Sequence, residues 1–228
     1  MFGNTASSRP YFPDTGFLAE ASEALRRVLA EHATEAGYAA GCVVMQQDDE
    51  GDSLYAVLEG RFEISVLSLH GRKLSLDLMG PGALFGEIAL FDPGPRIATV
   101  TAMTDGRLLR LRHAELLRAL HETPDVAADL LRLAGLRMRW MGRQLHEQVF
   151  LPMPARLARK LIHLAPEGGP DTVALSQAEL AEYVGATREA VSKTLAGWRR
   201  QGVIEVSRRG LAIRDRAALG ALADPEAI

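Results

Sequence analysis

The spacing of apolar residues changes along the chain, and each change marks a change of predicted secondary structure. From Phe17 to about His32, apolar residues recur at helical spacing, which predicts an amphipathic helix. Beyond Gly37 the period falls to two, and glycines separate short apolar segments. We expect these segments to be β-strands: Cys42–Met45, Ser53–Leu58, Phe62–Leu69, Lys73–Met79, Ile97–Ala102 and Leu108–Leu111. Many short strands separated by glycine turns are typical of a β-barrel or jelly roll.

Helical spacing returns in the second half of the chain. His113–Leu120 predicts a short helix, and a longer one follows Thr123-Pro124-Asp125, where proline suits the first helical turn. Its apolar positions are spaced as in a coiled-coil heptad: Ala127, Leu131, Ala134, Met138, Met141 and Leu145. This seam predicts pairing with a second copy of the helix, and the alternative is one stripe buried against the strands. Pro152 and Pro154 then end the helix and predict a hinge.

The segment after the hinge has the pattern of a winged helix-turn-helix. Ser176 begins one helix with a capping box, and Thr187 can cap a second helix that runs to Arg200. Val203–Val206 and Leu211–Ile213 predict a two-stranded wing. In such a motif the second helix enters the major groove of DNA.

Composition favours a globular protein of two domains. The chain has 228 residues, of which 47% are hydrophobic and 24% charged, a balance that supports a packed core. No run approaches the roughly 18 apolar residues that a membrane helix needs, and the N-terminus lacks an apolar signal peptide. We therefore expect a cytoplasmic protein with no membrane partner. The single cysteine, Cys42, rules out an intramolecular disulfide and a multi-cysteine metal site within one chain, and we expect it in the core.

The formal net charge of −3 conceals a basic C-terminal segment. Between Arg188 and Arg216, eight basic residues stand against three acidic ones, a balance of +5, so the rest of the chain carries −8. Arginine and lysine can donate to guanine, and glutamate can accept from cytosine. We predict contacts to double-stranded DNA from the helix caps, the outward face of the second helix and the wing: Ser176, Thr187, Arg188, Glu189, Ser192, Lys193, Arg208 and Arg209. The alternative is a solvated helical hairpin.

The stretch Leu84–Ala102 has the outline of a phosphate site. Gly86 permits close approach of the backbone to a ligand, and the apolar run after Glu87 can form about one helical turn whose N–H groups favour an anion. Arg96 can donate two parallel hydrogen bonds to phosphate, and Glu87 can accept one from a sugar hydroxyl. Together these residues describe a site for a small sugar phosphate. The residues alone also allow a plain β-turn between buried strands, with Arg96 as a surface charge.

Two motifs resemble a known family. Phe85-Gly86-Glu87-Ile88-Ala89-Leu90, followed by Pro95-Arg96 and Ala98-Thr99-Val100, resembles the phosphate-binding cassette of cyclic-nucleotide-binding domains, especially that of the protein kinase A regulatory subunit. Arg188-Glu189 with Lys193 resembles the DNA-reading Arg-Glu…Arg set of cyclic-AMP receptor proteins, although lysine replaces the last arginine. From about Phe17 to Arg216, the chain resembles the cyclic-AMP receptor protein/FNR superfamily of bacterial transcription regulators.

The resemblance implies an α+β fold in three parts. These are a β-roll effector domain at residues 17–122, a dimerisation helix and hinge at 123–151, and a winged helix-turn-helix at 152–228. It implies a homodimeric regulator, not an enzyme, that binds pseudo-palindromic DNA and contacts RNA polymerase. A small effector, cyclic AMP or cyclic GMP, would control it allosterically, and no metal or further cofactor is expected.

The resemblance assigns ligand binding to the cassette and the long helix, at Phe85, Gly86, Glu87, Ile88, Arg96, Ile97, Arg137, Met141 and Gly142. Ile97 stands where the bacterial cassette has a serine, so it cannot give a hydroxyl to the phosphate. Met141-Gly142 stands where the bacterial activator has a Thr-Ser pair that contacts adenine, while Arg137 and Gln144 could reach a base. The identity of the ligand's base therefore stays open. The alternative function is a regulator of the same fold that responds to a non-nucleotide ligand or to none.

Overall fold

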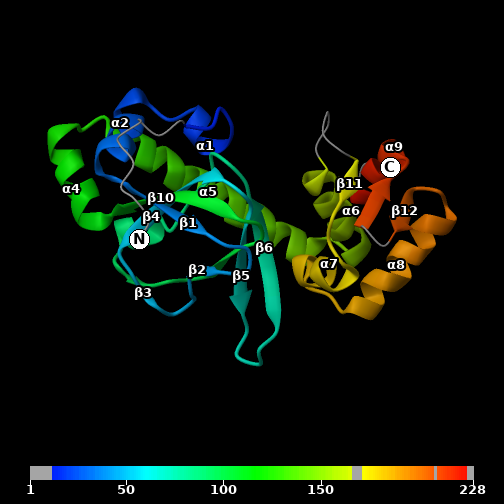
Figure 1. Cartoon of the computed structure of the whole chain (residues 1–228). Coiled ribbons are helices and arrows are strands. Elements are labelled where there is room, and N and C mark those ends of the chain that lie inside the picture. The colour runs from blue at the N-terminus through cyan, green and yellow to red at the C-terminus, as the bar shows by residue number, and fades with distance from the viewer. Residues whose placement is uncertain (1–11, 166–170, 208–209, 225–228) are drawn as a thin grey trace. The chain divides into compact units, whose positions relative to one another are not determined.

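The computed structural model describes residues 12–165, 171–207 and 210–224 of the chain. The chain divides into two compact units. The first comprises the chain up to Val66 together with Asp77–Met138, and the second comprises Leu67–Leu76 together with the chain from Arg139 onward. Strands dominate the first unit and helices the second (Figure 1). Within the described ranges, no helix has the length and apolar character to cross a membrane.

Two four-stranded sheets form the β-roll of the first unit. One sheet has the order β1 (Thr34–Tyr38), β10 (Gly106–Arg112), β4 (Ser53–Glu59) and β7 (Leu84–Phe85). The other has the order β2 (Val43–Met45), β9 (Thr99–Ala102), β5 (Phe62–Leu67) and β6 (Lys73–Met79). The ring of Phe62 lies 6.4 Å from that of Phe85 and 6.5 Å from that of Tyr38, so the two sheets face each other across an aromatic interior. Two short strands, β3 (Glu50–Gly51) and β8 (Gly94–Pro95), pair separately.

Helices cover the outer face of the first sheet. They are α1 (Gly16–Ala19), α2 (Glu23–His32), α4 (His113–Glu122) and the start of α5 (Val126–Phe150). Leu54 of β4 and Leu109 of β10 are buried in one cluster with Leu25 of α2. Because successive side chains of a strand point to opposite faces, their neighbours Tyr55 and Arg110 face the interior of the roll.

The predicted helix from Phe17 to His32 is two helices, because a polar residue caps the second one. Ser22 accepts a hydrogen bond at its hydroxyl oxygen from the backbone N–H of Leu25, 3.1 Å away, and so begins α2. The carboxylate of Asp129, which is 6% exposed, accepts from the Ser22 backbone N–H at 3.3 Å and from its hydroxyl. This buried carboxylate therefore ties the start of α2 to α5.

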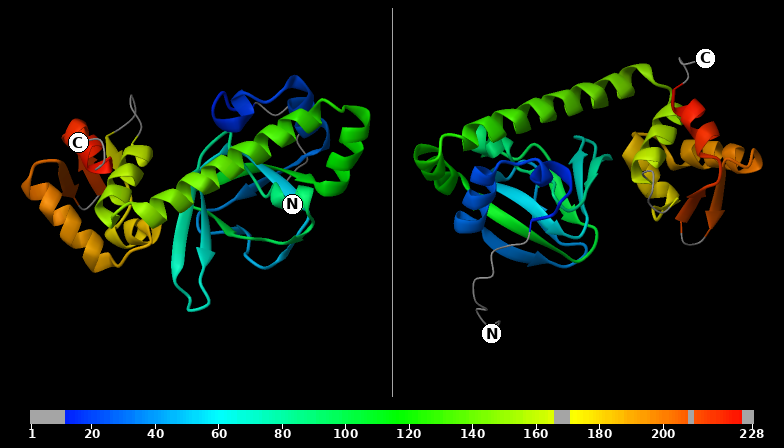
Figure 2. Two further views of the ribbon diagram at one scale, coloured as in Figure 1. Left: turned by 180° about the vertical axis from the view of Figure 1, so that it is seen from behind. Right: turned by 90° about the horizontal axis from the view of Figure 1, so that it is seen from above.

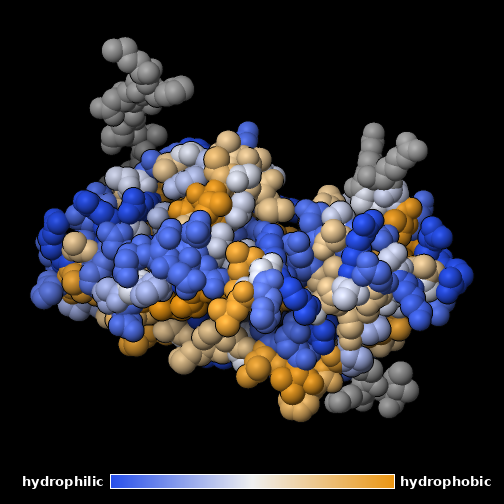
Figure 3. Space-filling view, turned by 90° about the horizontal axis from the view of Figure 1, so that it is seen from below, coloured by the Kyte–Doolittle hydropathy of each residue, from blue (hydrophilic) through white to orange (hydrophobic). Residues whose placement is uncertain are grey.

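The long helix α5 has two faces of different character, and Figure 2 shows it as one continuous rod. Its buried residues lie near its start: Val126, Asp129, Leu130 and Leu133. The predicted heptad seam lies on another face, where Leu131 is 73% exposed, Met138 64% and Leu145 67%. The alternative of a stripe buried against the strands is therefore wrong for these residues. Apolar side chains reach the surface as orange patches in Figure 3.

The second unit contains a winged helix-turn-helix. Its elements are α6 (Met153–Leu164), β11 (Thr172–Val173), α7 (Gln177–Val184), α8 (Arg188–Arg200), β12 (Ile204–Ser207), β13 (Gly210–Ile213) and α9 (Arg216–Ala223). The three strands form one sheet in the order β11-β13-β12. Val191, Leu195 and Trp198, which face inward on α8, are buried with Leu180 of α7 and Leu157 of α6. Inward apolar positions at helical spacing thus hold α8 against the core of the second unit.

The structure confirms the six strands predicted before residue 112, with shifted ends for all but Lys73–Met79, and both strands of the wing, and it corrects three expectations. Cys42 is exposed, not buried in the core, because it lies in the turn before β2. Pro154 does not break a helix but sits in the first turn of α6, where a missing N–H costs nothing. The strand β1 begins at Thr34, before the expected change of period at Gly37. The helix α9 and the two-residue strands were not predicted, since their patterns are too short or too uniformly apolar.

We predict that Asp129→Ala lowers the free energy of unfolding by about 2 kcal/mol, because the Ser22 N–H and hydroxyl lose a charged acceptor in a buried place. Urea denaturation followed by circular dichroism measures this change. Glu31→Ala, at an exposed position on α2, is the control and should stay within about 0.5 kcal/mol of the parent. Equal stability of the two variants would show that the Asp129 carboxylate does not hold α2.

Candidate functional site

The cassette contains a glycine, Gly86, at a position where any other residue would be strained. Gly86 follows β7 and has φ +80°, and a Cβ at this position would lie 2.7 Å from the carbonyl oxygen of Ser53. Glu87 comes next, and α3 (Ile88–Phe91) then forms the single helical turn that the sequence predicts. The glycine thus lets the backbone turn sharply beside β4 and carry Glu87 to the edge of the roll.

Arg96 is a buried cation held by backbone carbonyls. Its residue is 6% exposed, and its guanidinium donates from Nη2 to the Ser53 carbonyl at 2.9 Å and from Nη1 to the Gly86 carbonyl at 3.2 Å. The guanidinium also lies 5.9 Å from the centre of the Tyr55 ring. Among the residues described, Arg96 forms no ion pair. The expectation of a surface charge on a plain turn is therefore not met.

Burial has an electrostatic consequence for this guanidinium. Burial, the largest cause, lowers the pKa of Arg96, and the nearby acids Asp52 and Glu87 oppose that effect. A guanidinium still remains charged at neutral pH. Gly51 provides its space, because a Cβ there would lie 2.0 Å from Nε of Arg96. The site therefore encloses a positive charge that has lost much of its hydration.

Glu87 is paired with a residue from the long helix. The carboxylate, whose side chain is 8% exposed, accepts from Nε of Arg137 at 2.9 Å, and Arg137 also donates to the carbonyl of Leu84. The sequence suggested Arg137 as a group that could reach a ligand base. The structure instead brings it onto the carboxylate predicted to meet the sugar. Since an ionised carboxylate offers about four lone-pair sites, Glu87 can accept a further hydrogen bond.

The other predicted ligand residues are divided by the fold. Phe85 is buried and its ring stacks 5.0 Å from that of Tyr55, whereas Ile88 is 37% and Ile97 59% exposed. Met141 and Gly142 are exposed positions of α5 in the second unit. Gln144, also suggested for base contact, instead accepts from Nζ of Lys160 at 2.9 Å. The structure thus gathers Phe85, Gly86, Glu87, Arg96 and Arg137 in one place.

Sequence reasoning missed the strand β4 and its neighbours as part of this site. Ser53, Tyr55 and Gly51 surround Arg96, although they lie about forty residues before it in the chain. Two strand pairings bring them together: β4 with β7 places Tyr55 opposite Phe85, and β3 with β8 places Gly51 opposite Gly94. A run such as Ser53–Glu59 reads as an ordinary core strand, so no local signal identified it.

The helix-turn-helix presents the predicted DNA residues from two capped helices. The hydroxyl oxygen of Ser176 accepts from the Glu179 N–H at 3.2 Å at the start of α7, and that of Thr187 accepts from the Ala190 N–H at 3.2 Å at the start of α8. Gly185, with φ +64°, ends α7 and makes the tight turn between them. The two helices are therefore stabilised locally at the ends that matter for docking.

The outward face of α8 is open and polar. Thr187, Arg188, Glu189 and Lys193 are exposed, and Ser192 is partly exposed. In the part of the chain that the structure describes, the side chains of Arg188, Glu189 and Lys193 have no ion pair. They can therefore reach an incoming duplex without first breaking an ion pair. Arg208 and Arg209, the predicted tip of the wing, lie outside the described residues.

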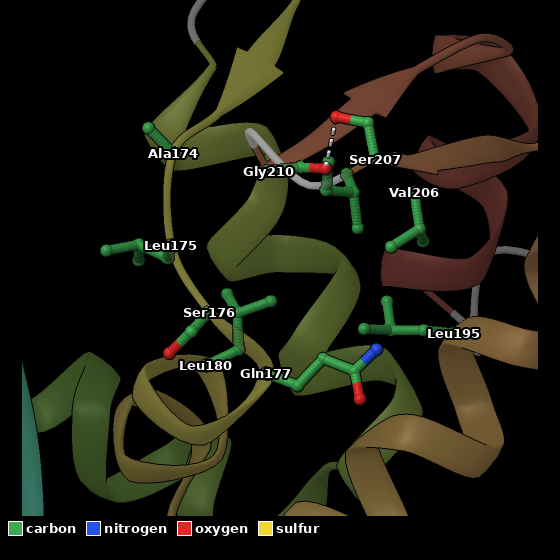
Figure 4. Close-up of a pocket in the computed structure, with 10 residues that line it drawn as sticks. Ala174, Leu175, Ser176, Gln177, Leu180, Leu195, Val206, Ser207 and Gly210 are labelled. Carbon is green, nitrogen blue, oxygen red and sulfur yellow. Dashed lines mark hydrogen bonds between the residues drawn. The ribbon is translucent and has the colours of Figure 1, made fainter.

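A cavity of about 330 Å³ lies in the second unit and is distinct from the cassette. Leu180 and Leu195 of the two helices and Val206 of the wing line it, with Ser176 and Ser207 among its polar groups (Figure 4). None of the predicted ligand residues contributes to it. It lies within the winged helix-turn-helix, so it is not the predicted effector site.

Comparison with known proteins agrees with both halves of this description. A family described as cyclic nucleotide-binding domain matches residues 36–123, and a family described as Crp-like helix-turn-helix domain matches residues 155–222. The "CRP-like cAMP-activated global transcriptional regulator" of Mycobacterium tuberculosis is 34% identical over 186 residues, which cover 78% of this chain and 83% of that protein. The "Cyclic AMP receptor protein" of Thermus thermophilus is 32% identical over 186 residues, 82% of this chain and 86% of that one.

Solved structures resemble the chain along most of its length. The catabolite activator protein of Thermus thermophilus is 31% identical, with a TM-score of 0.53 over 92% of this chain and 98% of that one. The c-di-GMP responsive regulator CLP of Xanthomonas campestris has a TM-score of 0.73 over 83% of this chain and 97% of that one, and at 22% identity it supports the fold alone. The chain matches a cyclic nucleotide-binding domain and a Crp-like helix-turn-helix domain, and a 34% identical relative covers 78% of it. It therefore belongs to the CRP/FNR family of transcription regulators.

Proposed function

We propose that a cyclic nucleotide binds in the β-roll and controls this regulator. The observation that carries the proposal is the Arg96 guanidinium, which is almost fully buried and has no ion-pair partner among the described residues. A buried charge without a counterion is costly, and a bound anion would offset that cost. A guanidinium has five N–H donors, and the two backbone carbonyls use two of them, so donors remain for phosphate oxygens.

The neighbouring groups suit the rest of a nucleotide. Glu87 can accept a hydrogen bond from a ribose hydroxyl beside its contact with Arg137. The free N–H groups at the start of α3 favour the same anion as Arg96, although one helical turn adds little by itself. The relatives from M. tuberculosis and T. thermophilus are named for cyclic AMP, which supports this ligand class. No described residue of the cassette fixes the identity of the base, so cyclic GMP is a second candidate.

We further propose that two copies of the chain pair through α5. Leu131, Met138, Met141 and Leu145 repeat at heptad spacing and are between 45% and 73% exposed in the single chain. Isolated exposed apolar residues are common, but a continuous seam of them along one helix is typical of an interface. A parallel or antiparallel helix pair would bury this seam and give the dimer that members of the family form.

The dimer would present two copies of α8 to a pseudo-palindromic DNA site. Two-fold symmetry in the protein requires two-fold symmetry in its site, with half-sites about 34–36 Å apart. The effector would act by binding one arrangement of the dimer more tightly than the others, since a ligand shifts an equilibrium only through such a difference. RNA polymerase is a further proposed partner. Because the protein would bind chromosomal DNA, we propose that it acts in the bacterial cytoplasm.

We predict that calorimetric titration with cyclic AMP and cyclic GMP detects binding of at least one nucleotide by the full-length protein. Arg96→Gln should weaken that binding at least about a hundredfold, because it removes the charge that offsets the phosphate. Arg61→Gln changes an exposed arginine in the turn between β4 and β5 and serves as the control. A folded protein that gives no heat with either nucleotide would contradict the proposed ligand class.

Leu145→Glu should convert the dimer to a monomer at micromolar concentration, because it places a charge at the C-terminal end of the proposed seam, where the leucine is 67% exposed in the single chain. Sedimentation velocity measures the two species. Arg143→Glu alters an exposed position two residues away, on another side of the helix, and should leave the dimer intact. If both variants sediment like the parent protein, α5 is not the interface.

Arg188→Ala should relax the preferred DNA sequence at one base pair per half-site, with a loss of about 1–3 kcal/mol in discrimination. Selection from a random DNA pool, followed by sequencing, reads the preference directly. The control is Arg214→Ala, an exposed arginine of the same unit whose Nε donates to Glu205 at 2.9 Å. An unchanged preference in the Arg188 variant would show that another element reads the bases.

A further inference from the structure

A second arginine faces the interior of the β-roll beside the cassette. Cross-strand pairing places Arg110 of β10 opposite Tyr55 of β4, and Tyr55 opposite Phe85 of β7. The flanking residues Leu109 and Leu111 are buried in the cluster on the helix-covered face. Because side chains alternate along a strand, Arg110 projects to the same face as Tyr55, over which the Arg96 guanidinium lies.

One residue holds both arginines. Nε of Arg110 donates to the hydroxyl oxygen of Ser53 at 2.8 Å, and Nη2 of Arg96 donates to the carbonyl oxygen of the same residue at 2.9 Å. Asp52 completes the cluster, because its carboxylate accepts from the Ser53 hydroxyl at 2.6 Å and from Nη2 of Arg110 at 3.2 Å. Both guanidiniums are therefore anchored on Ser53, one through its hydroxyl and the other through its carbonyl.

The two arginines differ in how solvent and ligands can reach them. The side chain of Arg110 is 44% exposed, whereas Arg96 as a residue is 6% exposed. The charges influence each other: after burial, the positive charge of Arg110 is among the causes that lower the pKa of Arg96. In turn the Ser53 hydroxyl first, and Arg110 after it, lower the pKa of Asp52. Arg110 is thus close enough to influence the charge of Arg96, and in the free protein its own charge is paired with the carboxylate of Asp52.

The cassette itself lacks a second side-chain donor for phosphate. Ile97, which follows Arg96, has no polar atom in its side chain and is 59% exposed. A cyclic phosphodiester carries two oxygens outside the ring, and the donors that remain on Arg96 after its two contacts with backbone carbonyls all come from a single side chain. Another donor on the interior face would complete the coordination of the phosphate.

We propose that Arg110 is a second phosphate-binding residue of the roll, held beside Arg96 by Asp52 and Ser53 in the free protein and shared with the phosphate of the bound nucleotide. This inference rests on the proposed cyclic-nucleotide site and extends it. Asp52 then acts as a competitor for Arg110. Removing Arg110 and removing the charge of Asp52 must therefore change the affinity in opposite directions.

The test is calorimetric titration of three full-length variants with whichever cyclic nucleotide the parent protein binds. Arg110→Gln should weaken binding about tenfold, and Asp52→Asn should strengthen it about threefold or more. Arg107→Gln is the matched control, because Arg107 lies on the same strand but pairs with Glu35 and Glu59 at an exposed place. Its affinity should match that of the parent.

The outcomes separate this inference from the proposed function. If the parent binds a nucleotide but Arg110→Gln and Arg107→Gln bind equally well, Arg110 does not contact the phosphate and only the inference fails. If Asp52→Asn and Arg110→Gln both weaken binding, the cluster merely supports the strand, and the inference again fails alone. If the parent binds neither cyclic AMP nor cyclic GMP, the proposed ligand class and the inference fail together.

Discussion

A guanidinium enclosed by backbone carbonyls is the constraint around which the ligand end of the roll is built. Arg96 needs the carbonyls of Ser53 and Gly86 as acceptors, so β4 and the cassette must lie close together. That closeness leaves no room for a Cβ at Gly86, and the path of the guanidinium leaves none at Gly51. Neutral carbonyls orient the cation without cancelling its charge, which is the state an anion-binding group requires.

The fold and the site were predictable to different degrees. Repeating patterns identified the strands, the long helix and the capped helices of the helix-turn-helix, because each pattern follows from local geometry. The cassette motif made Glu87 and Arg96 the candidates for the site for the same reason, since their spacing is local, and their role in binding a ligand stays a prediction. The partners Ser53 and Tyr55 come from a distant strand, and the registers of β4 with β7 and of β3 with β8 place them there. Cys42 was misplaced because residue type alone does not distinguish a turn from the core.

The long helix combines two tasks that a shorter element could not. Its first turns contribute Val126, Leu130 and Leu133 to the core under the β-roll, and Arg137 reaches the carboxylate of Glu87. The exposed seam runs along another face of the same rod. A ligand that draws Glu87 away from Arg137 therefore acts on a residue one turn or less from the seam residues Ala134 and Met138. The predicted site and the predicted interface share a single covalent element.

The contact between Asp129 and Ser22 has a consequence for how the effector domain could be shortened or recombined. The strands of the roll begin only at Thr34, so a cut just before β1 removes no strand of the roll and takes away only the helices α1 and α2. Yet the buried carboxylate on α5 has its hydrogen-bond donors at Ser22, before the first strand. A chain cut just before the roll would remove both Ser22 donors from this carboxylate and leave it the weaker contact with Arg132, whose Nη2 lies 3.8 Å from Oδ1. A shortened or recombined effector domain that keeps these hydrogen bonds must therefore include Ser22 and the start of α2.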